Sequence, residues 1–205
     1  MHCNLFPGKK HKFIAVKRTY AWMNDVQLVG WNSVLLVSLF RLGGCPPLLL
    51  WFTMGVQLLN VYDLYLILSK ARNGAVLPWV LQNGARVLFL ALLLIAKQQD
   101  IEFMLLYAVD AASVLLIVWS LAEISRFAFY VFKTDFLKML RYSAFLICYP
   151  AGVAIELVWI YYLYTGLPYT FAKIFLAILV IAYIVGFPYL FLHLYRSRKQ
   201  KLNHE

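Results

Sequence analysis

Charged side chains are scarce in this 205-residue chain, at 14% of all residues against roughly 25% in a typical soluble domain. Hydrophobic residues make up 63%, and the mean hydropathy is +0.74. This composition excludes a soluble globular protein and indicates a polytopic membrane protein. The net charge of +10 does not indicate a nucleic-acid partner, because the basic residues flank apolar segments, a pattern typical of membrane orientation and lipid contact.

Residue patterns for several common chemistries are also missing. The four histidines form no His-x-x-x-His box, which argues against a di-iron desaturase or a zinc protease, and there is no Gly-rich phosphate loop. Cys3, Cys45 and Cys148 have neither paired nor metal-like spacing, and none is followed by arginine six residues later. We therefore expect no metal, no cofactor, no disulfide and no thiolate phosphatase site.

Six apolar segments predict an all-α bundle of six transmembrane helices. Their connections are short, so neighbouring helices are expected to be antiparallel. The longest connection, Ser125–Arg141, is aromatic and is expected to lie at the membrane interface. The expected spans are Tyr20–Phe40, Leu48–Ser69, Val76–Ala96, Ile101–Ile124, Tyr142–Tyr164 and Phe171–Tyr195.

Basic residues are distributed unequally between the two ends of these spans. Fifteen lie on the side of both termini, and only Arg41 and Lys97 lie on the other. Positive residues favour the cytosol, so both termini are predicted to be cytosolic. The expected organisation is a basic segment over 1–19, a transmembrane domain over 20–195 and a basic tail over 196–205.

The fifth span carries Tyr149 and, seven residues later, Glu156. Seven residues make almost two helical turns, so both side chains share one face, roughly 10 Å apart along the axis. Pro150 follows Tyr149 and tends to kink a helix. An ionisable residue inside a span is costly, and we therefore assign Glu156 a functional role as the default hypothesis.

Other polar residues lie inside neighbouring spans. Asp63 in the second span and Arg86 in the third are candidates for an ion pair. Glu123 and Arg126, towards the cytosolic end of the fourth, are expected to join them in a polar network that holds the helices together. A polar path through the membrane is also left open, lined by Asp63, Arg86, Asp110 and Glu156.

Several short motifs run from the first span to the last. They are Asn24-x-x-Gln27-x-x-Gly30-Trp31, Gln82-x-x-x-Arg86, Trp119-Ser-x-x-Glu123-x-x-Arg126, Leu140-Arg141-Tyr142, Tyr149-Pro150-x-Gly152-x-x-x-Glu156 and Gly186-Phe187-Pro188. Together they resemble the 3-hydroxyacyl-CoA dehydratase family, also called protein-tyrosine-phosphatase-like proteins. The Tyr–Glu motif in its spanning context is the most specific of them.

The chain departs from that family in its second span and after Arg126. The family usually has L-E-x-x-H, where this chain has Asp63 at the glutamate and Leu66 at the histidine. Lys70 stands where the family has glycine, and Phe127 replaces a tyrosine. These changes indicate a divergent member, and they concern chain-length preference and packing more than the Tyr149–Glu156 pair.

The resemblance implies dehydration of a long-chain (3R)-hydroxyacyl-CoA to a trans-2-enoyl-CoA during very-long-chain fatty acid elongation in the endoplasmic reticulum. It names Tyr149 and Glu156 as the catalytic pair, and we assign Glu156 as the base and Tyr149 as the proton donor. Lys133, Lys138 and Arg141 are candidates for binding the CoA phosphates, or equally for attraction to the lipid surface. Implied partners are membrane lipids and the condensing enzyme and reductases of elongation.

Two other classes are compatible with the sequence. One is a catalytically inactive membrane scaffold with the same fold, although both members of the reactive pair are present. The other is a small transporter, although the chain is short and its two halves show no repeat.

Overall fold

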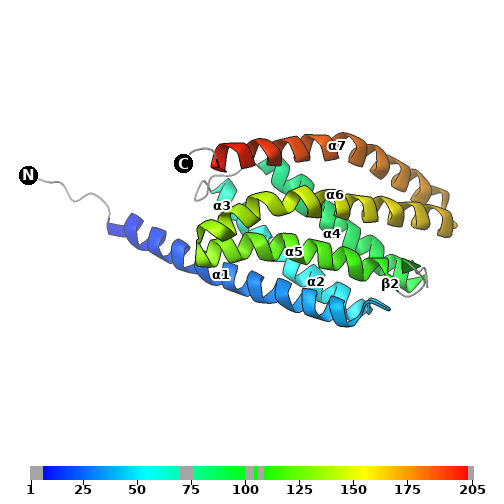
Figure 1. Ribbon diagram of the computed structural model, residues 1–205, viewed down its shortest axis with the longest axis horizontal. Coiled ribbons are helices and arrows are strands. Elements are labelled where there is room, and N and C mark those ends of the chain that lie inside the picture. Colours follow the sequence, from blue (N-terminus) through cyan, green and yellow to red (C-terminus); the bar gives the residue numbers. More distant parts are fainter. Residues whose placement is uncertain (1–6, 70–75, 100–103, 106–108, 203–205) are drawn as a thin grey trace, which may run out of the picture.

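The computed structural model describes residues 7–69, 76–99, 104–105 and 109–202, with side chains for 21–69, 76–99 and 109–200. Cys3 and Lys70, singled out above, lie outside the described residues. The helices run roughly along one long axis of the molecule (Figure 1). They are α1 (Pro7–Phe40), α2 (Pro47–Leu58), α3 (Val61–Leu68), α4 (Val76–Gln98), α5 (Ala111–Phe132), α6 (Asp135–Gly166) and α7 (Thr170–Leu202).

Four helices are long and apolar enough to cross a membrane: α4, α5, α6 and the Thr170–Gln200 part of α7. The all-α prediction is confirmed, and the chain is a multi-pass membrane protein. The third, fifth and sixth expected spans lie within α4, α6 and α7. The first expected span lies within the longer helix α1, and the total of six spans stays a prediction.

The second expected span is not one helix. It divides into α2 and α3, which are separated by a turn at Leu59 and Asn60. Asn60 is buried, and its side-chain oxygen accepts hydrogen bonds from Gln27 Nε2 of α1 at 3.2 Å and from Arg126 Nη2 of α5 at 2.9 Å. The polar residue Asn60 thus marks the break in this apolar segment, and its side chain is hydrogen-bonded to two other helices.

The fourth expected span was placed about ten residues too early. The short antiparallel strands β1 (Met104–Leu105) and β2 (Val109–Asp110) precede α5, which begins only at Ala111. The helix then continues to Phe132, so the stretch expected at the membrane interface holds the end of α5 and the start of α6. Apolar strand residues were mistaken for the first turns of a helix.

A two-residue turn joins α5 to α6. Lys133 adopts the left-handed conformation at φ 52°, which is common at helix C-termini, and its N–H bonds to the Phe129 carbonyl at 3.0 Å. Thr134 caps α6, because its hydroxyl oxygen accepts from the Leu137 N–H at 3.3 Å. This tight connection makes the two helices antiparallel neighbours.

Asp110 fixes the opposite end of α5. Its carboxylate caps the helix by accepting from the Ala112 N–H at 2.9 Å, accepts from the Cys45 N–H at 2.6 Å, and lies 3.6 Å from Lys97 Nζ. Burial and the neighbouring Asp110 carboxylate raise the pKa of the Cys45 thiol to about 12. Cys45 and Cys148 are both free thiols.

The packed centre of the bundle lies along α5, which contacts α1 on one side and α6 on the other. Trp31 of α1, Phe89 of α4, Leu115 of α5 and Trp159 of α6 are among its fully buried side chains. Helix α7 packs on α6 and exposes most of its apolar surface, as expected for a helix facing lipid. The start of α1, the α5–α6 turn and the end of α7 lie at one end of the bundle (Figure 1).

Candidate active site

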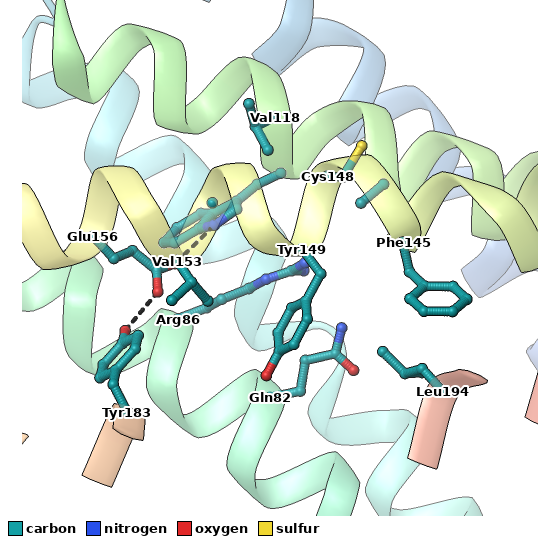
Figure 2. Close-up of a pocket in the computed structure, with 13 residues that line it drawn as sticks. Gln82, Arg86, Val118, Phe145, Cys148, Tyr149, Val153, Glu156, Tyr183 and Leu194 are labelled. Atoms are coloured by element: carbon teal, nitrogen blue, oxygen red, sulfur yellow. Dashed lines mark hydrogen bonds between the residues drawn. The ribbon is translucent and has the colours of Figure 1, made fainter. Parts of the chain in front are cut away.

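A pocket of about 80 Å³ lies between α4, α5, α6 and α7, and Figure 2 shows its side chains. We call it the inner pocket. It is apolar apart from a few polar groups, which is the usual character of a small-molecule site. It is lined by Gln82, Arg86, Val118, Trp119, Ala122, Phe145, Cys148, Tyr149, Gly152, Val153, Glu156, Tyr183 and Leu194.

Glu156 is the carboxylate of the inner pocket and is 7% exposed. Its Oε1 accepts a hydrogen bond from Trp119 Nε1 at 3.0 Å, and its Oε2 accepts one from the Tyr183 hydroxyl at 2.6 Å. An indole N–H can only donate, so Trp119 of α5 binds the carboxylate as a hydrogen-bond acceptor. Tyr183 of α7 donates the second hydrogen bond to it. Two donors from two helices thus orient Glu156, as the dashed lines in Figure 2 show.

Tyr149 lies on the same helix and lines the same pocket. Its ring stacks on Phe187 of α7, with centroids 5.1 Å apart and planes 17° apart, and more distantly on Phe191. Figure 2 shows its hydroxyl on the Gln82 side of the pocket, away from the Tyr183 hydroxyl that contacts Glu156. The predicted shared face of Tyr149 and Glu156 is therefore the face that lines this pocket.

Gly152 lies next to the indole of Trp119, between Tyr149 and Glu156 on α6. A Cβ added at this glycine would lie 3.6 Å from Trp119 Nε1, in van der Waals contact with the same N–H that donates to Glu156. The glycine of the Tyr-Pro-x-Gly-x-x-x-Glu motif thus lies beside the donor that α5 supplies to Glu156, and an alanine would fit there in ordinary contact.

A buried ionic cluster lies beside the inner pocket. Glu123 Oε1 binds Arg86 Nη1, and Glu123 Oε2 lies 2.7 Å from Arg126 Nη2. Arg86 is also 5.5 Å from the centre of the Trp119 ring. The structure therefore pairs Arg86 with Glu123, and the expected pairing with Asp63 is wrong. Asp63 lines a separate small pocket between α1, α3 and α5.

A second and larger pocket, of about 340 Å³, adjoins the inner one. We call it the outer pocket. The two pockets share Gln82, Ala122, Phe145 and Leu194. The remaining residues that line the outer pocket are Glu123, Ser125, Arg126, Tyr130, Arg141, Tyr142, Ala144 and Ser197.

The three basic residues proposed for substrate binding do not line one site in the structure. Arg141 lines the outer pocket, whereas Lys133 and Lys138 are not among the residues that line either pocket. Lys133 is exposed at the α5–α6 turn, and Lys138 is half-buried on α6.

Within the described residues, no group of three His, Cys, Asp or Glu side chains could hold a metal ion.

Sequence reasoning did not single out Tyr183. The residue lies in an apolar stretch without a motif, and only the packing of α7 on α6 brings it to Glu156. Trp119 was noted within a motif, but its donor role was not predicted. Its indole N–H could have indicated this donor role, because a buried tryptophan N–H usually has a hydrogen-bond partner.

Comparison with known proteins matches the family described as Protein tyrosine phosphatase-like protein, PTPLA, over residues 57–204. The chain belongs to this family. The match includes every polar residue of the inner pocket.

The chain is similar to curated relatives over a shorter stretch. It is 33% identical over 119 residues to very-long-chain (3R)-3-hydroxyacyl-CoA dehydratase 1 of Mus musculus, covering 47% of this chain and 41% of the relative. It is 34% identical over 115 residues to dehydratase 2 of Homo sapiens, covering 46% and 45%. It is 31% identical over 112 residues to dehydratase PASTICCINO 2A of Oryza sativa subsp. japonica, covering 43% and 49%. The chain thus spans less than half of each of these relatives. No solved structure matches it.

Proposed function

We propose that this PTPLA family member dehydrates a long-chain (3R)-3-hydroxyacyl-CoA to the trans-2-enoyl-CoA, as part of very-long-chain fatty acid elongation. The observation that carries the proposal is that Tyr149 and Glu156 line one pocket inside a bundle of apolar helices. The names of the curated relatives point to the same reaction. A long acyl chain suits an apolar helical environment, and an elimination needs only an acid and a base in fixed positions.

In the proposed mechanism Glu156 removes a proton from C2 of the acyl group. The electron pair of that C–H bond becomes the C2–C3 double bond, and the C3–O bond breaks. Tyr149 donates its proton to the departing oxygen, so the products are the enoyl thioester and water. Proton transfer from Glu156 back to Tyr149 then restores both groups, and no redox cofactor or metal is needed for the balance.

Trp119 and Tyr183 are proposed to position the base. Their two hydrogen bonds, at 3.0 and 2.6 Å, fix the carboxylate in the pocket. A base held in this way loses little further freedom when the substrate arrives, which is the advantage of a preorganised site. Neither residue need contact the substrate for this role.

The setting proposed for the reaction is the endoplasmic reticulum membrane, with both termini in the cytosol. The excess of basic residues on one side supports this orientation. The position of the start of α1 and the end of α7 at the same end of the bundle agrees with it (Figure 1). Residues 20–195 are the proposed dehydratase domain, and the condensing enzyme and reductases of elongation are its proposed partners.

Turnover of a 3-hydroxyacyl-CoA by the purified chain in lipid nanodiscs tests the function. Tyr149→Phe and Glu156→Gln should each lower kcat by about 10²–10⁴-fold, the usual contribution of a general acid or base. Tyr161→Phe is the matched control, because Tyr161 is 63% exposed on the same helix. Near-normal turnover by either pocket variant would refute the pair, and a folded chain without any turnover would favour the inactive scaffold.

A further inference from the structure

The outer pocket carries more positive charge than the residues around it neutralise. We propose that it is an anion-binding subsite in which Arg126 and Arg141 hold the diphosphate of the CoA thioester; this inference rests on the proposed function. The sequence offered three basic residues around the α5–α6 turn for this role. The structure instead points to one of them together with Arg126.

The charge balance of the pocket is the first argument. Glu123 is the carboxylate in its lining, and its two oxygens are already engaged by Arg86 and Arg126. Among the described residues, no carboxylate forms a salt bridge with Arg141. The outer pocket is thus lined by two guanidinium groups, of Arg126 and Arg141, and by one carboxylate that also neutralises Arg86, so a bound anion would offset the excess positive charge.

The way in which Arg141 is held is the second argument. Its Nη2 donates to the Tyr130 hydroxyl at 2.9 Å, and its guanidinium lies 4.5 Å from the Tyr130 ring centre and 4.9 Å from that of Tyr142. Aromatic faces fix the plane of a guanidinium without neutralising its charge. Arg141 is thus oriented at the pocket wall while most of its N–H donors have no acceptor among the described residues.

Arg126 offers a free donor as well. Its Nη2 is used by Asn60 and lies near Glu123, whereas its Nε is buried and, within the described part of the chain, has no hydrogen-bond partner. A buried N–H without a partner is costly, and the Arg126 side chain, which is 20% exposed, lines the pocket. Arginine forks suit phosphate oxygens in particular, because several N–H groups can bind two oxygens at once.

Distance identifies which part of the substrate would lie here. Arg141 and Glu156 are fifteen residues apart on α6, about 22 Å along the helix axis. An anion beside Arg141 therefore cannot be at the reacting carbon and must be joined to it by a linker. In a CoA thioester the pantetheine arm joins the diphosphate to the thioester in this way. The two pockets adjoin and share four lining residues, so the pantetheine arm would pass from the outer pocket to the inner one along these residues.

Equilibrium binding of two thioesters tests the subsite without requiring catalysis. Palmitoyl-CoA carries the diphosphate, and palmitoyl N-acetylcysteamine lacks it. In zwitterionic nanodiscs, Arg141→Gln should weaken palmitoyl-CoA binding about tenfold to a hundredfold, the usual value of hydrogen bonds to a charged group, and leave the truncated thioester unchanged. Arg141→Lys should recover only part of the loss, because lysine keeps the charge and loses the fork.

Arg196→Gln is the matched control, since Arg196 is an exposed arginine of α7 next to Ser197 of the pocket wall. It should change neither affinity by more than about twofold, as expected for a screened surface charge. An equal effect of the Arg141 and Arg196 variants, or an equal loss for both thioesters, would overturn the proposal. If Arg141→Gln binds the CoA thioester less tightly but wild-type chain shows no dehydration, the subsite stands and the proposed function fails.

A measurement on the wild-type chain removes any dependence on variant folding. Free CoA should slow the modification of Arg141 by phenylglyoxal, read peptide by peptide by mass spectrometry, and should not slow that of Arg196. The same experiment with phosphatidylserine in the nanodiscs distinguishes a lipid headgroup from CoA. Protection of Arg141 by the lipid alone, with no further effect of CoA, would assign the pocket to a lipid and contradict the proposal.

Discussion

Neutralising Glu123 should destabilise the folded bundle strongly. The Glu123 side chain is 3% exposed and holds two arginines, Arg86 and Arg126. Glu123→Gln keeps the shape but leaves two cations side by side without a counter-charge. Breaking a buried ion pair from one side costs about 3–5 kcal/mol. The two arginine side chains keep 10% and 20% exposure, so we expect the lower part of that range, about 3–4 kcal/mol.

Reversible unfolding in mixed detergent micelles, followed by tryptophan fluorescence, measures this loss. Asp25→Asn is the matched control, because Asp25 is exposed on α1, and it should change the free energy of unfolding by no more than about 0.5 kcal/mol. In a cycle with Arg86→Gln, the double variant should lose about 0.5–3 kcal/mol less than the sum of the single variants. Strict additivity, or a Glu123→Gln loss no larger than that of the control, would contradict the observed pairing.

Three further predictions address catalysis, packing and topology. Tyr183→Phe should lower kcat about tenfold to a hundredfold with little change in KM, because it removes a hydrogen bond that positions Glu156 and removes no contact with the substrate. Steady-state kinetics measure both constants, and a change confined to KM would contradict this role. Gly30→Ala should lower the free energy of unfolding by about 1–3 kcal/mol, because the new Cβ would lie 3.0 Å from Val56. Gly55→Ala is the control, because a Cβ at Gly55 meets open space and should not destabilise the protein. Similar losses of stability for both variants would show that close helix packing is not the cause. Tags at the two termini should both be accessible from the cytosol in permeabilised cells, and a lumenal tag at either end would contradict the proposed orientation.

The fold could be predicted where hydrophobicity alone decides it. Segments 76–96, 142–164 and 171–195 are long apolar runs, and each lies within a single helix. Hydropathy does not distinguish a strand from a helix over a few residues, so residues 104–105 and 109–110, which form β1 and β2, were wrongly expected to be helical. The capping signal of Asp110, which in the structure marks the true start of α5, was present in the sequence.

The site could be predicted along one helix but not between helices. A spacing of seven residues suffices to place Tyr149 and Glu156 on one face, since helical geometry is fixed. Which residue of another helix meets that face depends on the rotation and depth of each helix, and these follow from packing. For this reason the partner of Arg86 was misjudged, and Tyr183 gave no sign of its proximity to Glu156.

The break between α2 and α3 has a consequence for biosynthesis. The N–H and C=O groups of both turn residues are hydrogen-bonded within the segment, but the side-chain oxygen of Asn60 takes its donors from other helices. A buried polar side chain without these partners is costly in hydrocarbon, so the segment is expected to insert poorly on its own. The ribosome delivers Gln27 before Asn60 and Arg126 only after it, so the amide first meets one partner and acquires the second when α5 arrives. The segment is therefore expected to enter the bilayer together with α1 and to reach its final depth only once the later helices have been synthesised.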